Sequence, residues 1–189
     1  NLLNSDKISF AVIGRYSPQK DHHNFFKALK LLNNDNFKNK INIFIIGKDI
    51  KDNKIIIKTI KKNKIEFKIK MLDHFDDIRE VFKFIDFIIL PSLYGESFPN
   101  ILAESMISGV PCIATDIGES KNIIDRYGWI GPPNDPKKLS DSISQAVKVF
   151  SSQKAYLQLS NNCKRQISDN FSEKIMIAKY SKLYINLYS

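Results

Sequence analysis

A strand, a loop and a helix follow one another in the segment Phe87-Ile88-Ile89-Leu90-Pro91-Ser92-Leu93-Tyr94-Gly95-Glu96-Ser97-Phe98-Pro99-Asn100-Ile101-Leu102-Ala103-Glu104. The apolar run at its start has the length of a buried strand. Pro99 suits the first turn of a helix, because the N–H group that proline lacks would be unpaired there. Such a helix directs free backbone N–H groups and a positive dipole end at whatever lies above the loop.

Two glutamates, Glu96 and Glu104, stand in this segment with seven residues between them. At about 1.5 Å per helical residue, the second carboxylate lies roughly 8 Å beyond the mouth of the loop. This arrangement suits a nucleotide sugar, which has hydroxyls at both ends and phosphates between them. The alternative is a surface loop followed by a helix with ordinary glutamates. Apolar neighbours such as Leu102 and Met106 predict a mostly buried helix, and a charge there needs a partner or a ligand.

Working outward, apolar runs and helical patterns alternate along the whole chain, which predicts a Rossmann-like, doubly wound parallel α/β sheet of about six strands with helices on both faces. The expected strands are Ile8–Ile13, Ile41–Ile46, Phe67–Met71, Asp86–Leu90, Pro111–Thr115 and Gly128–Ile130. The expected helices are Asp21–Leu32, Asp52–Lys62, Asp77–Phe84, Pro99–Ser108, Pro136–Phe150, Gln153–Asp169 and Ser172–Tyr188. Ligands of such sheets bind beyond the carboxyl ends of the strands. Arg15, Lys48, Leu72, Glu96 and Asp116 all follow expected strand ends.

Arg15 and Lys20 come first on this rim and could bind two phosphates, with the guanidinium giving paired hydrogen bonds. The alternative is two solvated charges in a chain with 29 Lys and Arg. Asp21 is expected to cap the next helix, which would leave His22 and His23 as surface residues of its first turn without a catalytic role. His74 is expected to be a plain loop histidine.

Three motifs in order carry a resemblance to a known family. The segment from Leu90 to Asp116 is similar to the signature of group 1 glycosyltransferases, which are retaining enzymes of the GT-B architecture, also called family 4. Gly14-Arg15-Tyr16-Ser17-Pro18-Gln19-Lys20-Asp21 resembles the phosphate-contacting segment of that family. Gly128-Trp129-Ile130-Gly131-Pro132-Pro133-Asn134-Asp135-Pro136 resembles its following strand and Pro-rich loop. The resemblance runs from about Ile8 to Tyr188.

The resemblance implies a role for each motif residue. Glu104 would accept hydrogen bonds from the ribose, and Glu96 would hold the donor sugar with the backbone of Ser97 and Phe98. Arg15 and Lys20 would offset the charge of the leaving diphosphate without a metal or other cofactor. The catalytic residues expected are therefore Glu96, Arg15 and Lys20, with Glu96 giving electrostatic support or acting as a nucleophile. The donor-binding residues expected are Gly14, Arg15, Lys20, Met71, Leu72, Glu96, Ser97, Phe98, Pro99, Asn100, Ile101 and Glu104.

The chain also departs from the family pattern in the loops expected to line the base and ribose pocket. Gly47-Lys48-Asp49 stands where many relatives have Gly-x-Gly, and Met71-Leu72-Asp73 stands where they have Leu-Leu-Gly. Each change removes a glycine that lets backbone approach a ligand closely. The resemblance therefore leaves the base and the sugar open.

The length of 189 residues predicts one domain. By resemblance, residues 1–189 form the C-terminal nucleotide-sugar-binding domain, whereas the acceptor would bind to an N-terminal domain. Because the sequence begins at Asn1 rather than Met, we expect a piece of a longer protein that binds donor without transferring sugar by itself. In GT-B relatives the last helix crosses to the N-terminal domain, so the aromatic end of 172–188, Tyr184 and Tyr188, is expected to pack there. The alternative is a helix folded wholly onto its own domain.

The net charge of +9 comes from 29 basic and 20 acidic side chains. Lysine runs such as Lys58 to Lys64 could reflect a compositional bias, attraction to an anionic membrane or binding to nucleic acid; nucleic acid ranks last because no binding motif is present.

Cys112 and Cys163 are expected to be small apolar residues of a reducing compartment. By resemblance, the expected protein is a bacterial-like, cytoplasmic enzyme of polysaccharide or lipopolysaccharide synthesis that uses a glycan or lipid-linked acceptor. A peripheral position at the inner face of the membrane is an alternative location. A non-catalytic nucleotide-sugar-binding module and a sugar-nucleotide epimerase are the alternatives.

Overall fold

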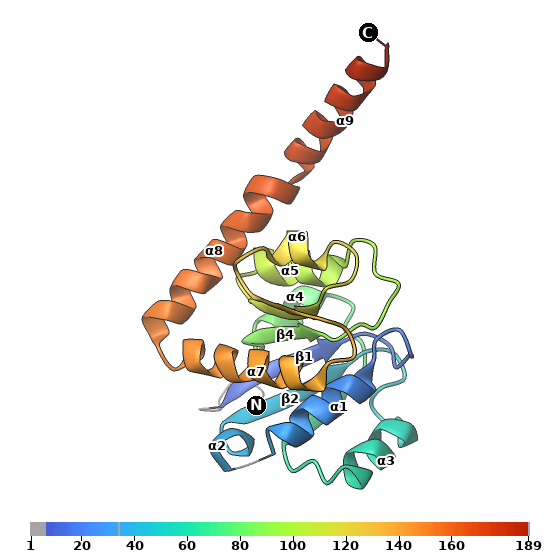
Figure 1. Ribbon diagram of the computed structural model, residues 1–189, viewed down its shortest axis with the longest axis vertical. Helices are drawn as coiled ribbons and strands as arrows, with labels where there is room; N and C mark the ends of the chain where they lie inside the picture. Colours follow the sequence, from blue (N-terminus) through green and yellow to red (C-terminus); the bar gives the residue numbers. More distant parts are fainter. Residues whose placement is uncertain (1–6, 34, 189) are drawn as a thin grey trace.

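The computed structural model describes residues 7–33 and 35–188, and a six-stranded parallel sheet lies at its centre (Figure 1). The strands are β1 (Ile8–Ile13), β2 (Ile41–Ile46), β3 (Lys68–Leu72), β4 (Phe87–Leu90), β5 (Cys112–Thr115) and β6 (Trp129–Gly131). Their order across the sheet is β3-β2-β1-β4-β5-β6. This is a doubly wound, Rossmann-like order, in which the first three strands are added toward one edge of the sheet and the last three, from β4 onward, toward the other edge. The predicted fold class is confirmed.

The central strands are apolar on both faces because helices cover both faces. All six residues of β2 are buried, and Phe10 and Val12 of β1 point to the opposite face from Ala11. Parallel sheets of this kind have near-continuous apolar strands rather than alternating ones. Strands β1 and β2 were predicted to the residue, and the other four strands shift by one residue at one or both ends.

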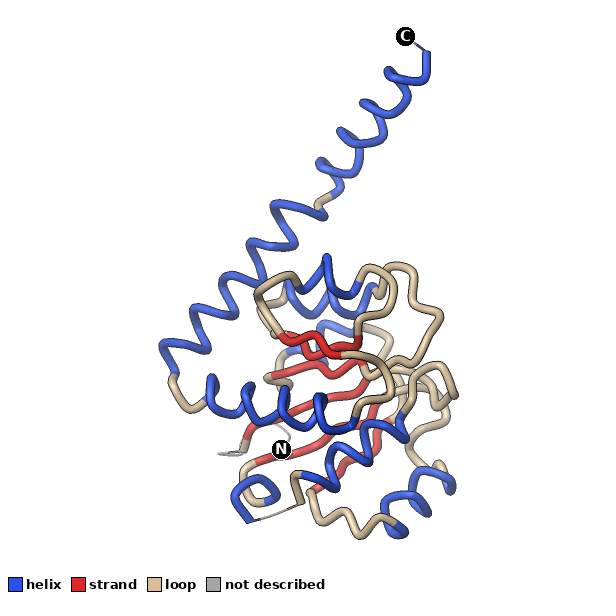
Figure 2. Tube along the Cα trace, viewed as in Figure 1, coloured by secondary structure: helices blue, strands red, loops and turns tan. Residues whose placement is uncertain are grey.

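Helices form a layer on each side of the sheet (Figure 2). On one side lie α1 (His22–Leu31), α2 (Asp35–Lys38), α3 (Lys54–Lys62) and α7 (Pro136–Phe150). On the other side lie α4 (Ile78–Phe82), α5 (Asn100–Ile107), α6 (Ser120–Ile124) and α8 (Gln153–Phe171). The short helices α2 and α6 were not predicted, because four or five residues give no helical period.

Side-chain caps fix several helix starts. The carboxylate of Asp21 accepts a hydrogen bond from the N–H of Asn24 at 3.0 Å, as expected. Asn53, Asp77, Asp135 and Ser152 cap α3, α4, α7 and α8 in the same way. Helix α9 (Glu173–Tyr188) follows α8 and extends away from the sheet (Figure 1). No helix in residues 7–33 and 35–188 has the length and apolar character needed to span a bilayer.

Candidate donor site at the switch point

Lys20 and Glu96 meet where the strand order reverses. Lys20 lies in the loop after β1 and Glu96 in the loop after β4, and these two strands are neighbours in the sheet. The Nζ of Lys20 lies 2.6 Å from Oε1 of Glu96. The Glu96 side chain is only 9% exposed, so this ion pair is largely shielded from water. The two predicted residues thus share one site at the carboxyl edge of the sheet, which is where doubly wound folds bind ligands.

Two hydrogen bonds hold these two loops together. The side-chain amide of Gln19 donates to the backbone carbonyl of Gly95 at 2.9 Å, and the N–H of Leu93 donates to the backbone carbonyl of Gln19 at 2.8 Å. Gly14, with φ of 147°, lies under the Lys20 side chain, whose Cε would be 3.4 Å from a Cβ atom at this position. The loop after β1 therefore packs against Lys20 and directs it toward Glu96.

A third loop, after β5, supports the loop that carries Glu96. Gly118 has φ of 58°, and a Cβ atom there would lie 2.1 Å from the carbonyl oxygen of Glu96. The N–H of Glu119 donates to the carbonyl of Ser97 at 2.8 Å. Glycine is therefore required at position 118 both by its left-handed backbone and by the close approach of the two loops.

Helix α5 begins directly behind this site. Pro99 is the buried N-cap residue, and Ser97, Phe98 and Asn100 around it are exposed. The expectation that Glu104 is buried is wrong. Leu102 and Met106 are buried, but Glu104 lies on the exposed side of α5.

Two of the predicted ligand-binding side chains have no polar partner among the residues that the structure describes. Arg15, after β1, is exposed. Neither its guanidinium nor the carboxylate of Glu104 forms a hydrogen bond or ion pair with a residue in the described ranges. Both groups are therefore available to a ligand.

The loops after β2 and β3 continue the rim toward the edge of the sheet. Met71 and Leu72 end β3 and are half-buried, and the N–H of Gly47 donates to the carbonyl of Leu72. Asp49, at the position where the resemblance implies glycine, has φ of 61°. Aspartate tolerates this left-handed conformation better than most residues, so the substitution keeps a glycine-like backbone at this position.

His22 is buried, so the expectation of a surface residue is wrong. It is 1% exposed, its ring lies 5.3 Å from that of Tyr16, and neither ring nitrogen has a hydrogen-bond partner among the residues described. Burial, and secondarily the charge of Lys20, lowers its pKa from 6.5 to about 4. His23 and His74 are exposed, as expected.

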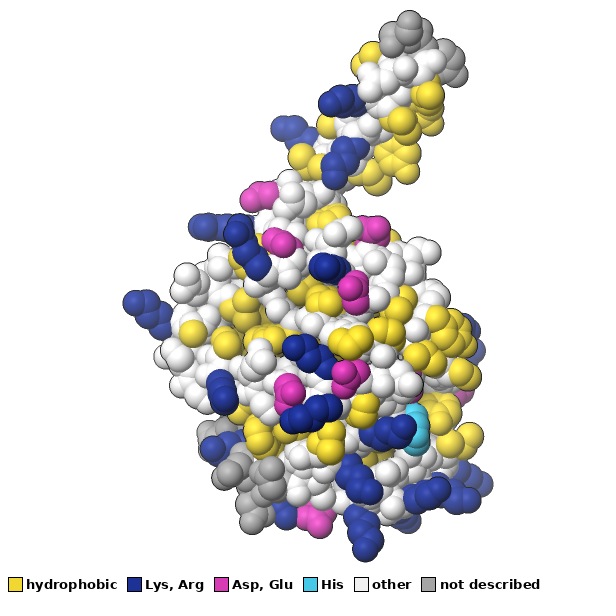
Figure 3. Space-filling view, viewed as in Figure 1, with side chains coloured by type: hydrophobic (Ala, Val, Ile, Leu, Met, Phe, Trp, Pro, Cys, Tyr) yellow, Lys and Arg dark blue, Asp and Glu magenta, His cyan; other side chains and the backbone are white. Residues whose placement is uncertain are grey.

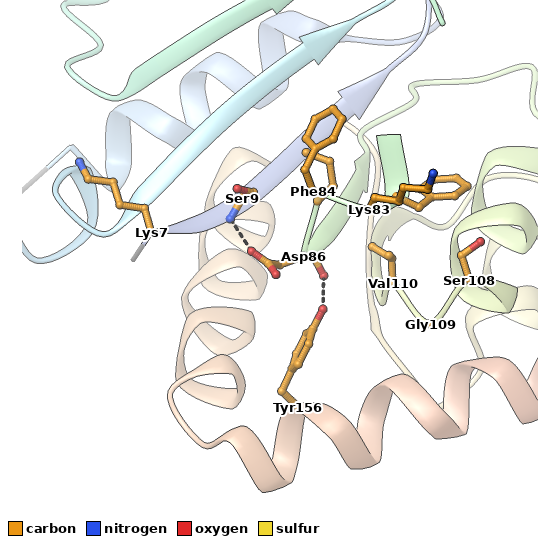
Figure 4. A pocket seen from close by; sticks show the side chains of 11 residues that line it. Lys7, Ser9, Lys83, Phe84, Asp86, Ser108, Gly109, Val110 and Tyr156 are labelled. Atoms are coloured by element: carbon orange, nitrogen blue, oxygen red, sulfur yellow. Dashed lines mark hydrogen bonds between the residues drawn. The ribbon is translucent and has the colours of Figure 1, made fainter. Parts of the chain in front are cut away.

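A separate cavity of about 320 Å³ lies at the opposite end of the sheet, where β1 and β4 begin (Figure 4). Asp86 accepts a hydrogen bond from the N–H of Ser9 at 2.8 Å, and its carbonyl accepts one from the hydroxyl of Tyr156 at 3.1 Å. Burial raises the pKa of Asp86. These contacts join β1, β4 and α8, and we interpret them as structural.

Three contributors to the candidate site were not singled out from the sequence: Ser92, Gln19 and Gly118. Ser92 is fully buried and donates a hydrogen bond to Glu96 at 2.7 Å. A serine and a glycine that follow strand ends by two or three residues are weak signals. Only their tertiary neighbours distinguish them from ordinary loop residues.

Known proteins are similar to this chain along most of its length. The family model described as "Glycosyl transferases group 1" matches residues 1–166. An Escherichia coli UDP-Gal:alpha-D-GlcNAc-diphosphoundecaprenol alpha-1,3-galactosyltransferase is 28% identical over 192 aligned residues, which cover 98% of this chain and 47% of that protein. The N-acetyl-alpha-D-glucosaminyl L-malate synthase of Bacillus anthracis is 24% identical over 134 residues, covering 70% of this chain and 34% of the synthase.

Solved structures share the fold over nearly the whole chain. A glycosyltransferase from Rickettsia africae superposes with a TM-score of 0.82 at 20% identity, over 98% of this chain and 49% of that one. Anabaena Alr3699/HepE, solved with UDP and glucose, gives a TM-score of 0.74 at 17% identity, over 97% and 49%. The chain spans about half the length of these relatives. On the extent of the family match, the chain belongs to the group 1 glycosyl transferases.

Proposed function

We propose that this chain supplies the donor site of a retaining glycosyltransferase, which transfers a sugar from a nucleoside diphosphate sugar to a glycan or lipid-linked acceptor. The contact between Lys20 and Glu96 at 2.6 Å carries the proposal. It joins a cation suited to phosphate and a carboxylate suited to sugar hydroxyls at the switch point of the sheet. Arg15 and Glu104 lie on the same rim, and neither side chain forms a hydrogen bond or ion pair with another described residue.

Each residue has a proposed role in binding. Arg15 and Lys20 bind the diphosphate together with the N–H groups at the start of α5, at Asn100 and Ile101, and the backbone of Gly14. Glu104 accepts hydrogen bonds from the ribose hydroxyls. Glu96, with the backbone of Ser97, Phe98 and Pro99, holds the donor sugar, and the backbone of Met71 and Leu72 approaches the base.

In the proposed reaction, the bond between the sugar and the diphosphate breaks through an oxocarbenium-like state, and the acceptor attacks from the same face. The leaving group gains negative charge as this bond breaks, and Arg15 and Lys20 offset that charge in place of a metal. Glu96 stabilises the developing positive charge on the sugar. The proposed reaction therefore requires both the loop after β1, which carries Arg15 and Lys20, and the loop after β4, which carries Glu96.

A calorimetric binding screen tests the donor proposal. The chain should bind one of UDP, GDP, ADP and CDP together with its sugar derivative, and UDP and UDP-galactose are tested first because of the galactosyltransferase relative. Binding to none of the four would refute the proposal. Retention is tested with a longer protein that contains the chain, by assigning the anomeric configuration of the product by NMR. An inverted product would overturn it.

We further propose that α9 packs against an N-terminal domain. Its apolar side chains lie along the projecting helix (Figure 3), with Tyr180 57%, Tyr184 58% and Leu187 69% exposed; the side chain of Tyr188 lies outside the described part. Changing Tyr184 and Leu187 to serine should leave the melting temperature of this chain unchanged and weaken its association with an added N-terminal domain. A lower melting temperature of the chain alone would favour a helix folded onto its own domain.

Peripheral association with an anionic membrane is also proposed, through α3. Residues 48–64 contain seven lysines and two aspartates, a net charge of +5, and α3 itself has no acidic residue. Lysine and arginine side chains gather around this end of the molecule (Figure 3). In vesicle sedimentation, changing Lys58 and Lys62 to glutamate should reduce binding to phosphatidylserine vesicles, with binding to phosphatidylcholine vesicles as the baseline. The same change at the exposed residues Lys148 and Lys154 is the control, and equal loss would leave only net charge as the cause.

A further inference from the structure

The two carboxylate oxygens of Glu96 have different surroundings. Oε1 accepts hydrogen bonds from Nζ of Lys20 at 2.6 Å and from the hydroxyl of Ser92 at 2.7 Å. No residue in the described ranges donates a hydrogen bond to Oε2. A carboxylate can accept several hydrogen bonds, so the second oxygen keeps its full capacity. Glu96 is therefore held by one oxygen, and the other has no protein partner in this part of the chain.

Ser92 is itself held firmly. It is fully buried, and it lies two residues beyond β4. Its carbonyl accepts a hydrogen bond from the hydroxyl of Thr115, the last residue of β5, at 2.5 Å. The serine is thus attached to the neighbouring strand end, and its single hydroxyl proton is donated to Glu96. A flexible glutamate side chain with two fixed donors on one oxygen loses most of its rotational freedom.

We propose that Ser92 is a positioning residue, which with Lys20 orients Glu96 so that Oε2 accepts a hydrogen bond from a hydroxyl of the donor sugar. The inference deepens the proposed function and rests on it. Lys20 supplies a positive charge that offsets the carboxylate next to the diphosphate. Ser92 adds no charge, but its hydrogen bond to Oε1 fixes the orientation of the Glu96 carboxylate. Ser92 therefore acts on the sugar end of the donor and not on its nucleotide end.

This role differs measurably from that of a buried serine that only needs a hydrogen-bond partner. Loss of a purely structural hydroxyl lowers stability and disturbs all ligands alike. Loss of a positioning hydroxyl frees Glu96 and affects only ligands that carry the sugar. The paired ligands UDP and UDP-galactose separate the two cases, because they differ by the sugar alone.

The experiment measures Kd for UDP and UDP-galactose by calorimetry in the wild-type chain and in Ser92→Ala. We expect the affinity for UDP-galactose to fall by roughly five- to tenfold, which is less than the roughly 10- to 100-fold expected when a hydrogen bond to a charged group is lost outright, while that for UDP changes less than about twofold. Ser140→Ala is the matched control, because Ser140 is also buried and its hydroxyl donates to a backbone carbonyl on α7. It should alter neither affinity.

A double-mutant cycle shows whether Ser92 acts through Glu96. In a Glu96→Gln background, Ser92→Ala should have little further effect on UDP-galactose. Equal loss for UDP and UDP-galactose, no loss for either, or full additivity with Glu96→Gln would overturn the inference. A wild-type chain that binds no nucleoside diphosphate would instead refute the proposed function. If another base is preferred, the corresponding diphosphate and its sugar derivative replace the uridine pair.

Discussion

Replacing the buried His22 should make the stability of this chain less sensitive to acid. The pKa of His22 is about 4 in the folded protein and about 6.5 when the chain is unfolded. Above pH 6.5 the ring is neutral in both states. Between pH 6.5 and 4 the unfolded chain binds a proton that the folded chain does not, so stability falls as the pH falls through this range. From pH 7.5 to pH 5 the expected loss from this residue is about 2 kcal/mol.

Urea denaturation at pH 7.5 and pH 5 measures this loss. In His22→Leu the drop in unfolding free energy should be about 2 kcal/mol smaller than in the wild type. Leucine also suits the site at pH 7.5, because neither ring nitrogen of His22 has a partner among the described residues. His23→Leu, at the exposed neighbour, is the matched control and should keep the wild-type pH dependence. Other titrating groups, such as Asp86, are common to all three proteins and cancel. A wild-type-like drop in His22→Leu would refute the reasoning.

Three further substitutions test the donor site and its supporting loops. Arg15→Ala should weaken UDP binding roughly 10- to 100-fold in calorimetry and leave uridine binding unchanged. Arg165→Ala, at another exposed arginine, is the control and should change neither affinity. An equal loss of affinity for uridine would contradict phosphate binding by Arg15. Glu104→Gln should weaken UDP binding but not that of its 2′,3′-dideoxy analogue, and a lower melting temperature without this discrimination would indicate a structural role. Gly118→Ala should lower the melting temperature and UDP-galactose affinity, because its Cβ would lie 2.1 Å from the carbonyl of Glu96. Gly131→Ala is its control and should have a smaller effect, because a Cβ atom there would meet only side-chain atoms of Lys138, at 2.9 Å or more, and no backbone.

The fold was largely predictable because its strongest signal is local. Each strand is an apolar run that is buried by helices on both faces, and this signal survives in the sequence without knowledge of neighbours. Helix α5 could be predicted from Pro99 and Gly109, and Gly109 has the left-handed φ of 84° expected beyond a helix end. Helices α2 and α6 have four and five residues, so tertiary contacts rather than a periodic pattern define them.

The site was predictable only to the level of a shared rim. Parallel strands bring the residues after them to one edge, which is why Arg15, Lys20 and Glu96 could be assigned together. Burial of individual side chains depends on how each helix is rotated against the sheet. His22 and His23 are adjacent in the sequence, yet only His22 faces the core. Glu104 has the opposite outcome, because it lies on the exposed side of a helix whose other side is apolar.

The ion pair between Lys20 and Glu96 changes how the affinity for a donor should be understood. The family resemblance implied separate partners for them, phosphate for Lys20 and sugar for Glu96, but without ligand each is the partner of the other at 2.6 Å. A diphosphate that attracts Lys20 takes away part of the charge that offsets Glu96, and an unpaired carboxylate with 9% exposure is unfavourable. A donor that carries both groups compensates for this, because its sugar hydroxyl reaches Glu96 as its phosphate reaches Lys20. A free nucleoside diphosphate offers no such hydroxyl. We therefore expect that removal of the Glu96 charge raises the affinity for the free diphosphate relative to that for the nucleotide sugar. Removal of the Lys20 charge should change this ratio of affinities in the opposite direction.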